Sequence, residues 1–521
     1  MAITTLFRGR EEFLYKYYLR SKQRIVKMAT KEKTIQLLDR HTAQKPVIHP
    51  IRVMQFGGGN FLRAFCDWMF DVLNKTTAFN GSVAVVKPTE TGDYTALREQ
   101  NGLFTVALDG IKNGKTVSEV TLVESISTII QPYTEWDKYL ALAGLPELRF
   151  IVSNTTEAGI QFSENDKITD CPPKEFPAKL TLWLYHRYSY FNGDKDKGCI
   201  LLPCELIEDN GEALKETVIQ YAKHWQIKQE FIDWILNCNH FCSTLVDRIV
   251  SGYPTDRAPF LEEKTGFKDK LLVAGEEYHS WVIKANALVQ KELPFSKTDL
   301  NVQFVDNLHD YREMKVRILN GAHTSLVPVG YLAGLRTVKE SMDNEVVSNH
   351  IFQILATEIK PTLTKFSSNE IDAFIDAVVD RFKNPTLQHF LIAISLNSTS
   401  KFQSRLLPAF KDYNQLHGSF PKRIAFSLAS LIRFYKGSFN GEVIAVTDDK
   451  LVLNFFENQW KMVENKSQSV TDLVAHTLAN KTIVGEDLTK YKGLVDFIAK
   501  SITAIDEYGV EECLRKNRKL I

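Results

Sequence analysis

The first half of the chain alternates short apolar runs with longer amphipathic patterns. Apolar runs of strand length occupy residues 51–56, 82–86, 149–153 and 199–204. Helical periodicity follows them at residues 61–73, 136–143, 179–191 and 213–225. Residues 104–127 alternate in polarity on either side of Lys112-Asn113-Gly114-Lys115 and predict a β-hairpin. Alternation of strand and helix is typical of an α/β domain with a parallel sheet.

From about residue 311 the pattern changes to long amphipathic helices. They are expected at residues 345–366, 370–382, 387–396, 401–413, 424–435 and 470–478. The predicted fold is therefore an α/β Rossmann-type N-terminal domain, residues 46–295, followed by a mainly α-helical C-terminal domain, residues 296–521. Residues 1–45 form an N-terminal extension with a short helical pattern at 31–41. A ligand site is expected where the two domains meet.

The length and the net charge of the chain exclude several classes of protein. A chain of 521 residues is too long for one core, and its net charge of +1 offers nothing to attract nucleic acid or an anionic membrane. No apolar run approaches the roughly 18 residues of a membrane span. We expect a small molecule as partner, and neither nucleic acid nor membrane. The oligomeric state is left open, and a monomer is compatible with the sequence.

Seven cysteines are thinly spread over the chain. An odd number of isolated cysteines is typical of free thiols in a reducing compartment, which predicts a cytoplasmic protein. The nearest approach to a metal motif is Cys238-Asn239-His240-Phe241-Cys242, and no second pair with zinc spacing accompanies it. No metal is expected.

The first 28 residues are rich in arginine, lysine and aromatic residues. They lack the apolar segment of a secretory signal, and the acidic pair Glu11 and Glu12 counts against an organellar presequence. Met28 resembles a second start, so we expect a dispensable or loosely attached segment.

A glycine turn follows the first apolar run. Phe56 is succeeded by Gly57-Gly58-Gly59-Asn60, and a helical pattern begins at Phe61. The order strand, glycine turn, helix places phosphate oxygens on the N–H groups of a helix N-terminus. Residues Phe56 to Phe61 are therefore candidates for nucleotide binding, although Leu62 replaces the last glycine of the usual fingerprint.

The second apolar run indicates which dinucleotide is bound. It ends in Lys87-Pro88-Thr89-Glu90. Glu90 could accept a hydrogen bond from the ribose of NAD, whereas Lys87 could attract the 2′-phosphate of NADP. Glu90 and NAD are the working expectation, and the choice stays open at this point.

The candidate catalytic stretch runs from Lys315 to Thr324 in a helical pattern. At about 100° per residue, Asn320 lies about 140° and His323 about 80° round the helix from Lys315. An amine, an amide and an imidazole on one side suit carbonyl–alcohol chemistry as proton carrier, oxyanion donor and orienting group. The simpler alternative is the solvated edge of an ordinary amphipathic helix.

Taken together, the residues from Gln55 to Phe65 and those from Lys315 to His323 resemble the long-chain mannitol dehydrogenase family of polyol and sugar-acid dehydrogenases. The resemblance implies a Rossmann-type domain with a helical domain, NAD as cofactor, and a mechanism without zinc. It makes Lys315 the general acid/base, Asn320 and Asn210 the oxyanion pocket, and His323 a ligand of the substrate hydroxyl or the reacting oxygen. Asp247, within Val246-Asp247-Arg248-Ile249, also matches a family motif and is assigned to the cofactor site.

Pro203-Cys204-Glu205-Leu206 and residues 395–402 resemble the branch of this family that interconverts D-altronate and D-tagaturonate. Lys401 matches a substrate-binding lysine, and Ala393 and Ile394 stand where mannitol-type members carry an arginine. Arg405 is a second candidate for the substrate carboxylate, or else a surface ion pair. The alternatives are a fructuronate reductase, a mannitol 2-dehydrogenase-like enzyme, and a silent nucleotide-binding protein on the same fold.

Overall fold

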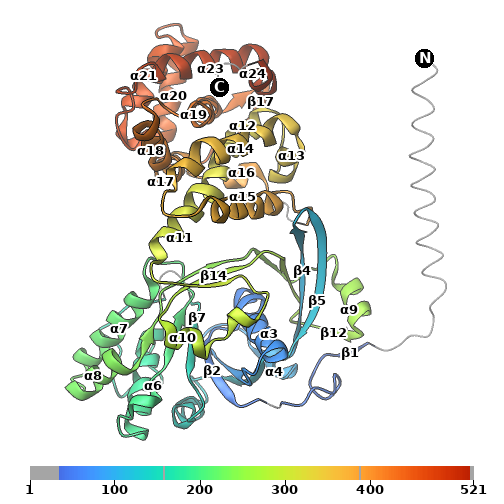
Figure 1. Ribbon diagram of the computed structural model, residues 1–521, viewed down its shortest axis with the longest axis vertical. Coiled ribbons are helices and arrows are strands. Elements are labelled where there is room, and N and C mark those ends of the chain that lie inside the picture. Colours follow the sequence, from blue (N-terminus) through green and yellow to red (C-terminus); the bar gives the residue numbers. More distant parts are fainter. Residues whose placement is uncertain (1–34, 48, 156–158, 387–388, 517–521) are drawn as a thin grey trace, which may run out of the picture.

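The computed structural model consists of two bodies stacked along the long axis of the molecule (Figure 1). It describes residues 35–47, 49–155, 159–386 and 389–516. Helix α11 (Leu308–Lys315) leads from the lower, N-terminal body into the upper, helical one. The predictions for residues 1–28 lie outside the described residues.

A six-stranded parallel sheet forms the centre of the lower body, in the order β6-β3-β2-β7-β8-β9. Its strands are β2 (Ile51–Phe56), β3 (Ser82–Val86), β6 (Ile126–Ile130), β7 (Phe150–Ser153), β8 (Ile200–Pro203) and β9 (His240–Phe241). The chain builds one half of the sheet outward from β2 and then returns to build the other half from β7. The carboxyl ends of β2 and β7 therefore flank the switch point, where sheets of this kind bind ligands.

Helices cover this sheet because its strands are apolar on both faces. The covering helices are α3 (Trp68–Thr76), α5 (Trp136–Ala141), α6 (Phe176–Tyr190), α7 (Asn210–His224) and α8 (Gln229–Cys238). Their apolar sides pack onto the strands in two clusters of buried residues, one on each face. The strand and helix alternation read from the sequence is present in this order.

Two smaller sheets connect this body to the helical one. Strand β4 (Phe104–Lys112) pairs with β5 (Lys115–Val123) in the predicted hairpin, and its tip reaches α15 (Ser368–Phe382), where the N–H of Gly114 donates to Asp380 Oδ2 at 3.2 Å. The other sheet contains β10 (Thr244–Asp247), β14 (Ser280–Lys284) and β15 (Val302–Val305). Since β15 pairs with β14, this sheet continues past residue 295, where the patterns placed the domain limit.

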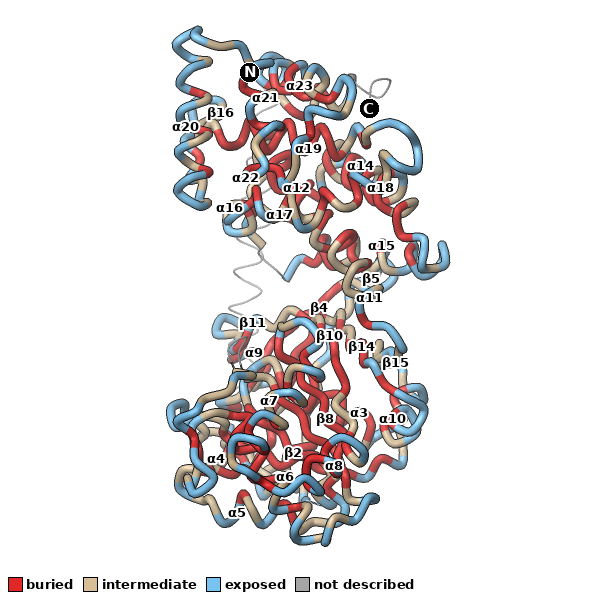
Figure 2. The backbone as a smooth tube through the Cα atoms, turned by 90° about the vertical axis from the view of Figure 1, so that its left-hand side faces the viewer, coloured by how far each residue is buried: buried red, intermediate tan, exposed pale blue. Residues whose placement is uncertain are grey.

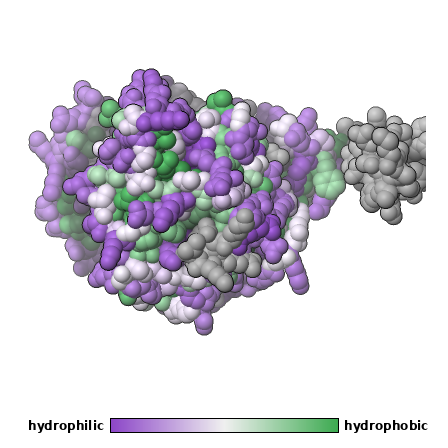
Figure 3. Space-filling view, turned by 90° about the horizontal axis from the view of Figure 1, so that it is seen from above, coloured by the Kyte–Doolittle hydropathy of each residue, from purple (hydrophilic) through white to green (hydrophobic). Residues whose placement is uncertain are grey.

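The helical body has its own buried interior, separate from that of the lower body (Figure 2). Helix α12 (Gly321–Leu332) runs through it and packs against α19 (Lys422–Phe434). Around them lie α14 (Glu345–Gln353), α17 (Ser398–Arg405), α18 (Leu407–His417), α20 (Lys450–Glu464), α21 (Val470–Ala479), α23 (Leu494–Tyr508) and α24 (Val510–Lys516). From above, hydrophilic side chains dominate its surface (Figure 3). None of the helices in the described residues is long and apolar enough to cross a membrane.

The helix predicted at residues 31–41 is not formed by its described part. Gln36–Leu37 instead form strand β1, which pairs in parallel with β12 (Phe267–Lys268). The guanidinium of Arg40 donates to the carbonyl oxygens of Glu124 and Ile126. Long-range hydrogen bonds of this kind override a weak local helical tendency.

We predict that acid destabilises the protein through His279. Its Nε2 accepts from the N–H of Asn301 at 3.0 Å, and burial followed by the charge of Arg248 lowers its pKa to about 3. An unfolded histidine titrates near pH 6.5, so below that pH the unfolded state binds more protons and stability falls, by about 2 kcal/mol at pH 5.

Urea unfolding of the native protein and of His279→Gln at pH 7.5 and pH 5 measures the contribution of His279 to the loss of stability in acid. The variant should lose less stability between the two pH values than the native protein does. His186→Gln, at an exposed histidine, is the control and should behave like the native protein. Equal losses in all three proteins would contradict the assignment.

Candidate active site

The candidate catalytic helix contains a π-turn. Helix α11 ends at Lys315, the π-helix η5 spans Val316–Asn320, and α12 begins at Gly321, whose N–H donates to the carbonyl of Val316 five residues earlier. A π-turn holds more residues than an α-turn, so the angle between Lys315 and Asn320 is smaller than the about 140° of a regular helix. Isolated π-turns of this kind occur frequently at functional sites.

Lys315 lies at the boundary between the two bodies. Its Nζ is 3.5 Å from Oδ2 of Asp247 and 3.5 Å from the carbonyl oxygen of Val246, both at the end of β10. The side chain remains 21% exposed. The amine is therefore held by the lower body while its backbone belongs to the helix that enters the upper one.

The main partner of Asp247 is an arginine that no sequence pattern indicates. Arg381 on α15 donates to both carboxylate oxygens of Asp247, at 3.0 and 3.1 Å, and to both of Glu276, at 3.0 and 2.8 Å. Burial raises the pKa of Asp247, but the charges of Arg381 and Lys315 outweigh it and hold the pKa below its usual value. No local motif marks Arg381, because its partners are more than a hundred residues away in the sequence.

His323 is poised to meet a ligand through one ring nitrogen. Its ring stacks on Phe382 with centroids 4.2 Å apart, and its buried Nε2 has no hydrogen-bond partner among the described residues. Burial, then the nearby His389, Arg381 and Arg405, lower its pKa to about 3, so the imidazole is neutral at physiological pH. The amide of Asn320 likewise makes no hydrogen bond within the described part of the chain, and both side chains are free to contact a substrate.

Helix α17 carries two cations, Lys401 and Arg405, of which Arg405 lies close enough to His323 to lower its pKa. Lys401 donates from Nζ to the carbonyl of Ile394 at 2.8 Å, and its pKa is lowered by burial and then by the charge of Arg405. The guanidinium of Arg405 has no acidic partner in the described residues, and burial lowers its pKa too. A half-buried guanidinium without a counter-ion favours binding of an anion, which argues against the surface ion pair considered for Arg405.

Asn210 lies apart from this cluster, at the start of α7. Its Nδ2 donates to the carbonyls of Pro203, Glu205 and Thr244 at 3.0 to 3.1 Å, and its Oδ1 accepts from the N–H of Thr244. The buried amide is fully used in tying β8 to β10 and has no N–H left for a substrate oxygen in this structure.

Glu205, from the motif that suggested the sugar-acid branch, fastens the loop after β7. Its carboxylate accepts from the hydroxyl of Ser153 and from both the N–H and the hydroxyl of Thr155, at 3.0 to 3.1 Å. Asn154 adds a bond to the carbonyl of Cys204 at 2.7 Å. The loop after β7, which borders the switch point, is thereby joined to the loop after β8.

The glycine turn has the shape that the nucleotide prediction requires. Gly57 has φ +114°, and Gly58 donates its N–H to the hydroxyl of Tyr94 at 2.9 Å. Gly59 is the N-cap of the helical segment that begins at Asn60, without a side-chain cap, and a Cβ atom added to it would meet nothing within 4 Å. Open space beside uncapped N–H groups can receive a phosphate. Phe56 is buried beneath the turn, and Phe61 stacks on Phe65.

Lys87 and Glu90 follow β3, and only one of their charged groups is free to bind a cofactor. Nζ of Lys87 donates to the carbonyl of Glu90 at 2.8 Å, and the lysine is buried. The carboxylate of Glu90 is exposed and has no partner among the described residues. The group that suits the ribose of NAD is thus free, and the group that suits a 2′-phosphate is engaged.

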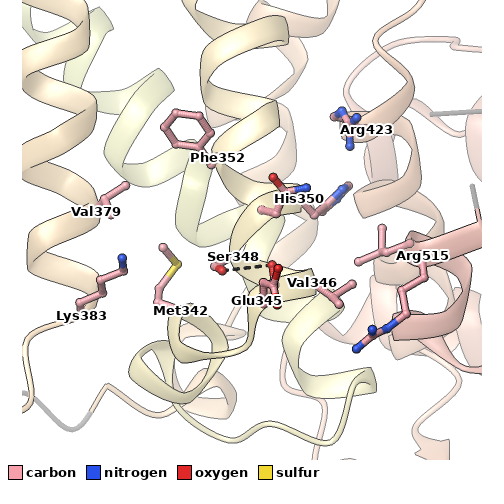
Figure 4. A pocket seen from close by; sticks show the side chains of 12 residues that line it. Met342, Glu345, Val346, Ser348, His350, Phe352, Val379, Lys383, Arg423 and Arg515 are labelled. Carbon is pink, nitrogen blue, oxygen red and sulfur yellow. Dashed lines mark hydrogen bonds between the residues drawn. The ribbon is translucent and has the colours of Figure 1, made fainter. Parts of the chain in front are cut away.

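A well-formed cavity in the helical body contains none of the predicted site residues. It measures about 370 Å³ and is lined by α14, by Val379 and Lys383 at the end of α15, and by two arginines. These are Arg423 and Arg515, and Figure 4 shows both of them opposite Lys383.

One group of side chains could in principle hold a metal ion. His309, Asp310 and Glu313 lie close enough to share a cation, but Lys365 and Arg317 already pair with the two acids. Absence of a catalytic metal stays a prediction.

Comparison with known proteins assigns the chain to a family. The Rossmann domain model of mannitol dehydrogenase matches residues 51–297, and the C-terminal domain model of mannitol dehydrogenase matches residues 307–506. The chain belongs to the mannitol dehydrogenase family. The family resemblance and the predicted fold class are confirmed.

Curated relatives of this mannitol dehydrogenase family member include altronate oxidoreductases. Those of Escherichia coli O7:K1 and of Shigella flexneri are each 44% identical over 468 residues, covering 90% of this chain and 97% of the relative. Solved structures of family members have the same fold. The Pseudomonas fluorescens mannitol 2-dehydrogenase complex with NAD and D-mannitol has a TM-score of 0.61 at 20% identity, covering 93% of this chain and all of that one. Substrate-free D-sorbitol dehydrogenase has a TM-score of 0.73 at 19% identity, covering 92% and 100%.

We predict that Asn210 is needed for stability. Asn210→Ala removes a buried amide and leaves carbonyls of β8 and β10 unpaired, which should lower the free energy of unfolding by about 2–4 kcal/mol. Urea denaturation measures it, and Asn237→Ala, at an exposed asparagine of α8, is the control. An unchanged unfolding free energy together with lost turnover would restore the oxyanion role for Asn210.

Proposed function

We propose that this chain is an NAD-dependent oxidoreductase that interconverts D-altronate and D-tagaturonate, with Lys315 as the general acid/base. The 44% identity with curated altronate oxidoreductases over 90% of the chain is the observation that carries the proposal. The arrangement of Lys315, Asn320 and His323 at the domain boundary supports it. We propose the N-terminal body for the cofactor and the helical body for the sugar acid.

The residues around the glycine turn fit a dinucleotide. The N–H groups of Gly57 and Gly58 donate to Val86 and Tyr94, so those of Gly59 and Asn60 would hold its pyrophosphate. The free carboxylate of Glu90 would accept from the ribose hydroxyl. The engaged amine of Lys87 favours NAD over NADP. NAD, when bound, supplies the acceptor for the hydride that leaves the carbinol carbon.

Each catalytic group then has a separate task. Lys315 takes the proton of the carbinol hydroxyl during oxidation of altronate and returns it during reduction of tagaturonate. The amide N–H of Asn320 donates to the oxygen as negative charge develops on it. The neutral imidazole of His323 binds a substrate hydroxyl or the reacting oxygen through its unpaired Nε2.

Lys401 and Arg405 would bind the carboxylate that distinguishes a sugar acid from a polyol. Arg405 has no other anion to bind in the described residues, and it lies near enough to both Lys401 and His323 to lower their pKa values. Charge-assisted bonds of a guanidinium to a carboxylate are among the stronger polar contacts in proteins.

Replacing the lysine tests the central claim. Lys315→Ala should lower kcat for tagaturonate reduction by about 10²–10⁴-fold, because the proton donor and its positioning are lost together. Initial rates of NADH oxidation measure it. Lys339→Ala is the control, since the Lys339 side chain is 37% exposed and, within the described residues, its amine pairs only with Asp343.

The same assay with D-tagaturonate, D-fructuronate and D-fructose separates the alternatives. Turnover of tagaturonate alone is expected. Preference for fructuronate or fructose would indicate a fructuronate reductase or a mannitol 2-dehydrogenase-like enzyme. Absence of turnover with NADH and with NADPH would leave a silent nucleotide-binding protein.

A second variant tests recognition of the carboxylate. Arg405→Gln should raise the KM for tagaturonate about 10–100-fold, because a charged hydrogen bond of about 1.5–3 kcal/mol is lost. Any residual rate with neutral D-fructose should be unaffected. Arg433→Gln, at an arginine of the same body that pairs with Asp506, is the control. An equal loss with both sugars would refute a specific role in binding the carboxylate.

A further inference from the structure

Arg381 bridges the two bodies at the candidate active site. Its side chain, 5% exposed, projects from α15 of the helical body and meets Asp247 of β10 and Glu276 of β13 (Val273–Glu276) in the lower body. Its guanidinium also lies 4.2 Å from the centre of the Tyr278 ring. With both forks of the guanidinium occupied, its orientation is fixed.

Consecutive residues at the end of α15 reach two candidate catalytic groups, Lys315 through Asp247 and His323 directly. Arg381 binds Asp247, which in turn is the acidic partner of Lys315. Phe382 stacks on the ring of His323. A single helical turn thus determines the surroundings of both the proton carrier and the histidine.

Asp247 lies between two cations and is closer to one of them than to the other. Arg381 makes two hydrogen bonds with it, at 3.0 and 3.1 Å, whereas Nζ of Lys315 is 3.5 Å away. A carboxylate beside a lysine favours the ammonium form, and a second cation on the same carboxylate opposes that effect. Oxidation of an alcohol requires the neutral amine. A second cation that weakens the effect of Asp247 therefore favours the form of Lys315 that accepts the proton.

We infer that Arg381 is a positioning residue that takes up the charge of Asp247 and thereby sets the pH range in which Lys315 accepts a proton. The inference rests on the proposed function. Arg381 does not touch the reacting atoms in this arrangement and acts on Lys315 through Asp247.

Other charged or titratable groups surround this cluster and stay constant in the experiment below. Glu276 and Tyr278 face Arg381 from the lower body, and Arg312 shares α11 with Lys315 and pairs with Glu208. In the helical body, His323, His389 and Arg405 complete the surroundings. Of these groups, Glu276 alone hydrogen-bonds to Arg381, and its own N–H partner at Ile249 keeps it in place.

The test is the pH dependence of kcat/KM for altronate oxidation. In Arg381→Gln the unshared carboxylate of Asp247 favours the ammonium form of Lys315, so the pH of half-maximal rate should rise by about one unit. Asp247→Asn in the same protein removes that carboxylate, and the double variant should return toward the native midpoint. Arg381→Lys retains a charge and should shift the midpoint less.

Controls separate this role from a structural one. Arg433→Gln removes a buried arginine elsewhere in the helical body and should leave the midpoint unchanged. Should Arg381→Gln fail to fold, Arg381→Lys alone must still shift the midpoint upward. Lower rates with an unmoved midpoint in every Arg381 variant would overturn the inference while leaving the proposed function intact. Full turnover in Lys315→Ala would instead refute the proposed function.

Discussion

The contact on which the candidate active site depends is the buried pairing of Arg381 with Asp247 and Glu276. Two carboxylates that lie this close together and are hidden from water would repel one another and lose their hydration. The guanidinium satisfies both with four hydrogen bonds, and its rigid fork imposes their geometry. Because these groups come from both bodies, the same bonds join the bodies and orient the carboxylate beside Lys315.

Two further hydrogen bonds cross the boundary between the bodies. The hairpin tip at Gly114 binds Asp380, and the amide of Asn384 donates to the carbonyl of Asp109 at 3.2 Å. Each body has its own apolar core. These contacts between the bodies are hydrogen bonds and ion pairs, so a substrate bound between them competes for polar groups of the same kind.

The sequence predicts most of the fold because the signals for it are local. The glycine turn after β2, the hairpin turn at Gly114 and the periodicity of α15 or α19 all lie within short windows of sequence. At the site, the family motif identifies Lys315, Asn320 and His323, and the structure adds the features that give these residues their surroundings. Arg381 and the full use of the Asn210 amide depend on residues distant in sequence. The π-turn gives no periodic signal of its own, since it changes the angle between residues without changing their order.

That π-turn makes the winding of the helix, and not only its sequence, a determinant of the geometry of the site. A π-turn is equivalent to one extra residue in an α-helix, accommodated without disturbing the helix on either side. If the same residues were wound as an uninterrupted α-helix, every side chain beyond Asn320 would be rotated by about 100° relative to Lys315. His323 would then leave Phe382, while the amine remained beside Asp247. The single wider turn at Val316–Asn320 therefore sets the orientation of His323 relative to Lys315, which an exchange of side chains alone would not reproduce.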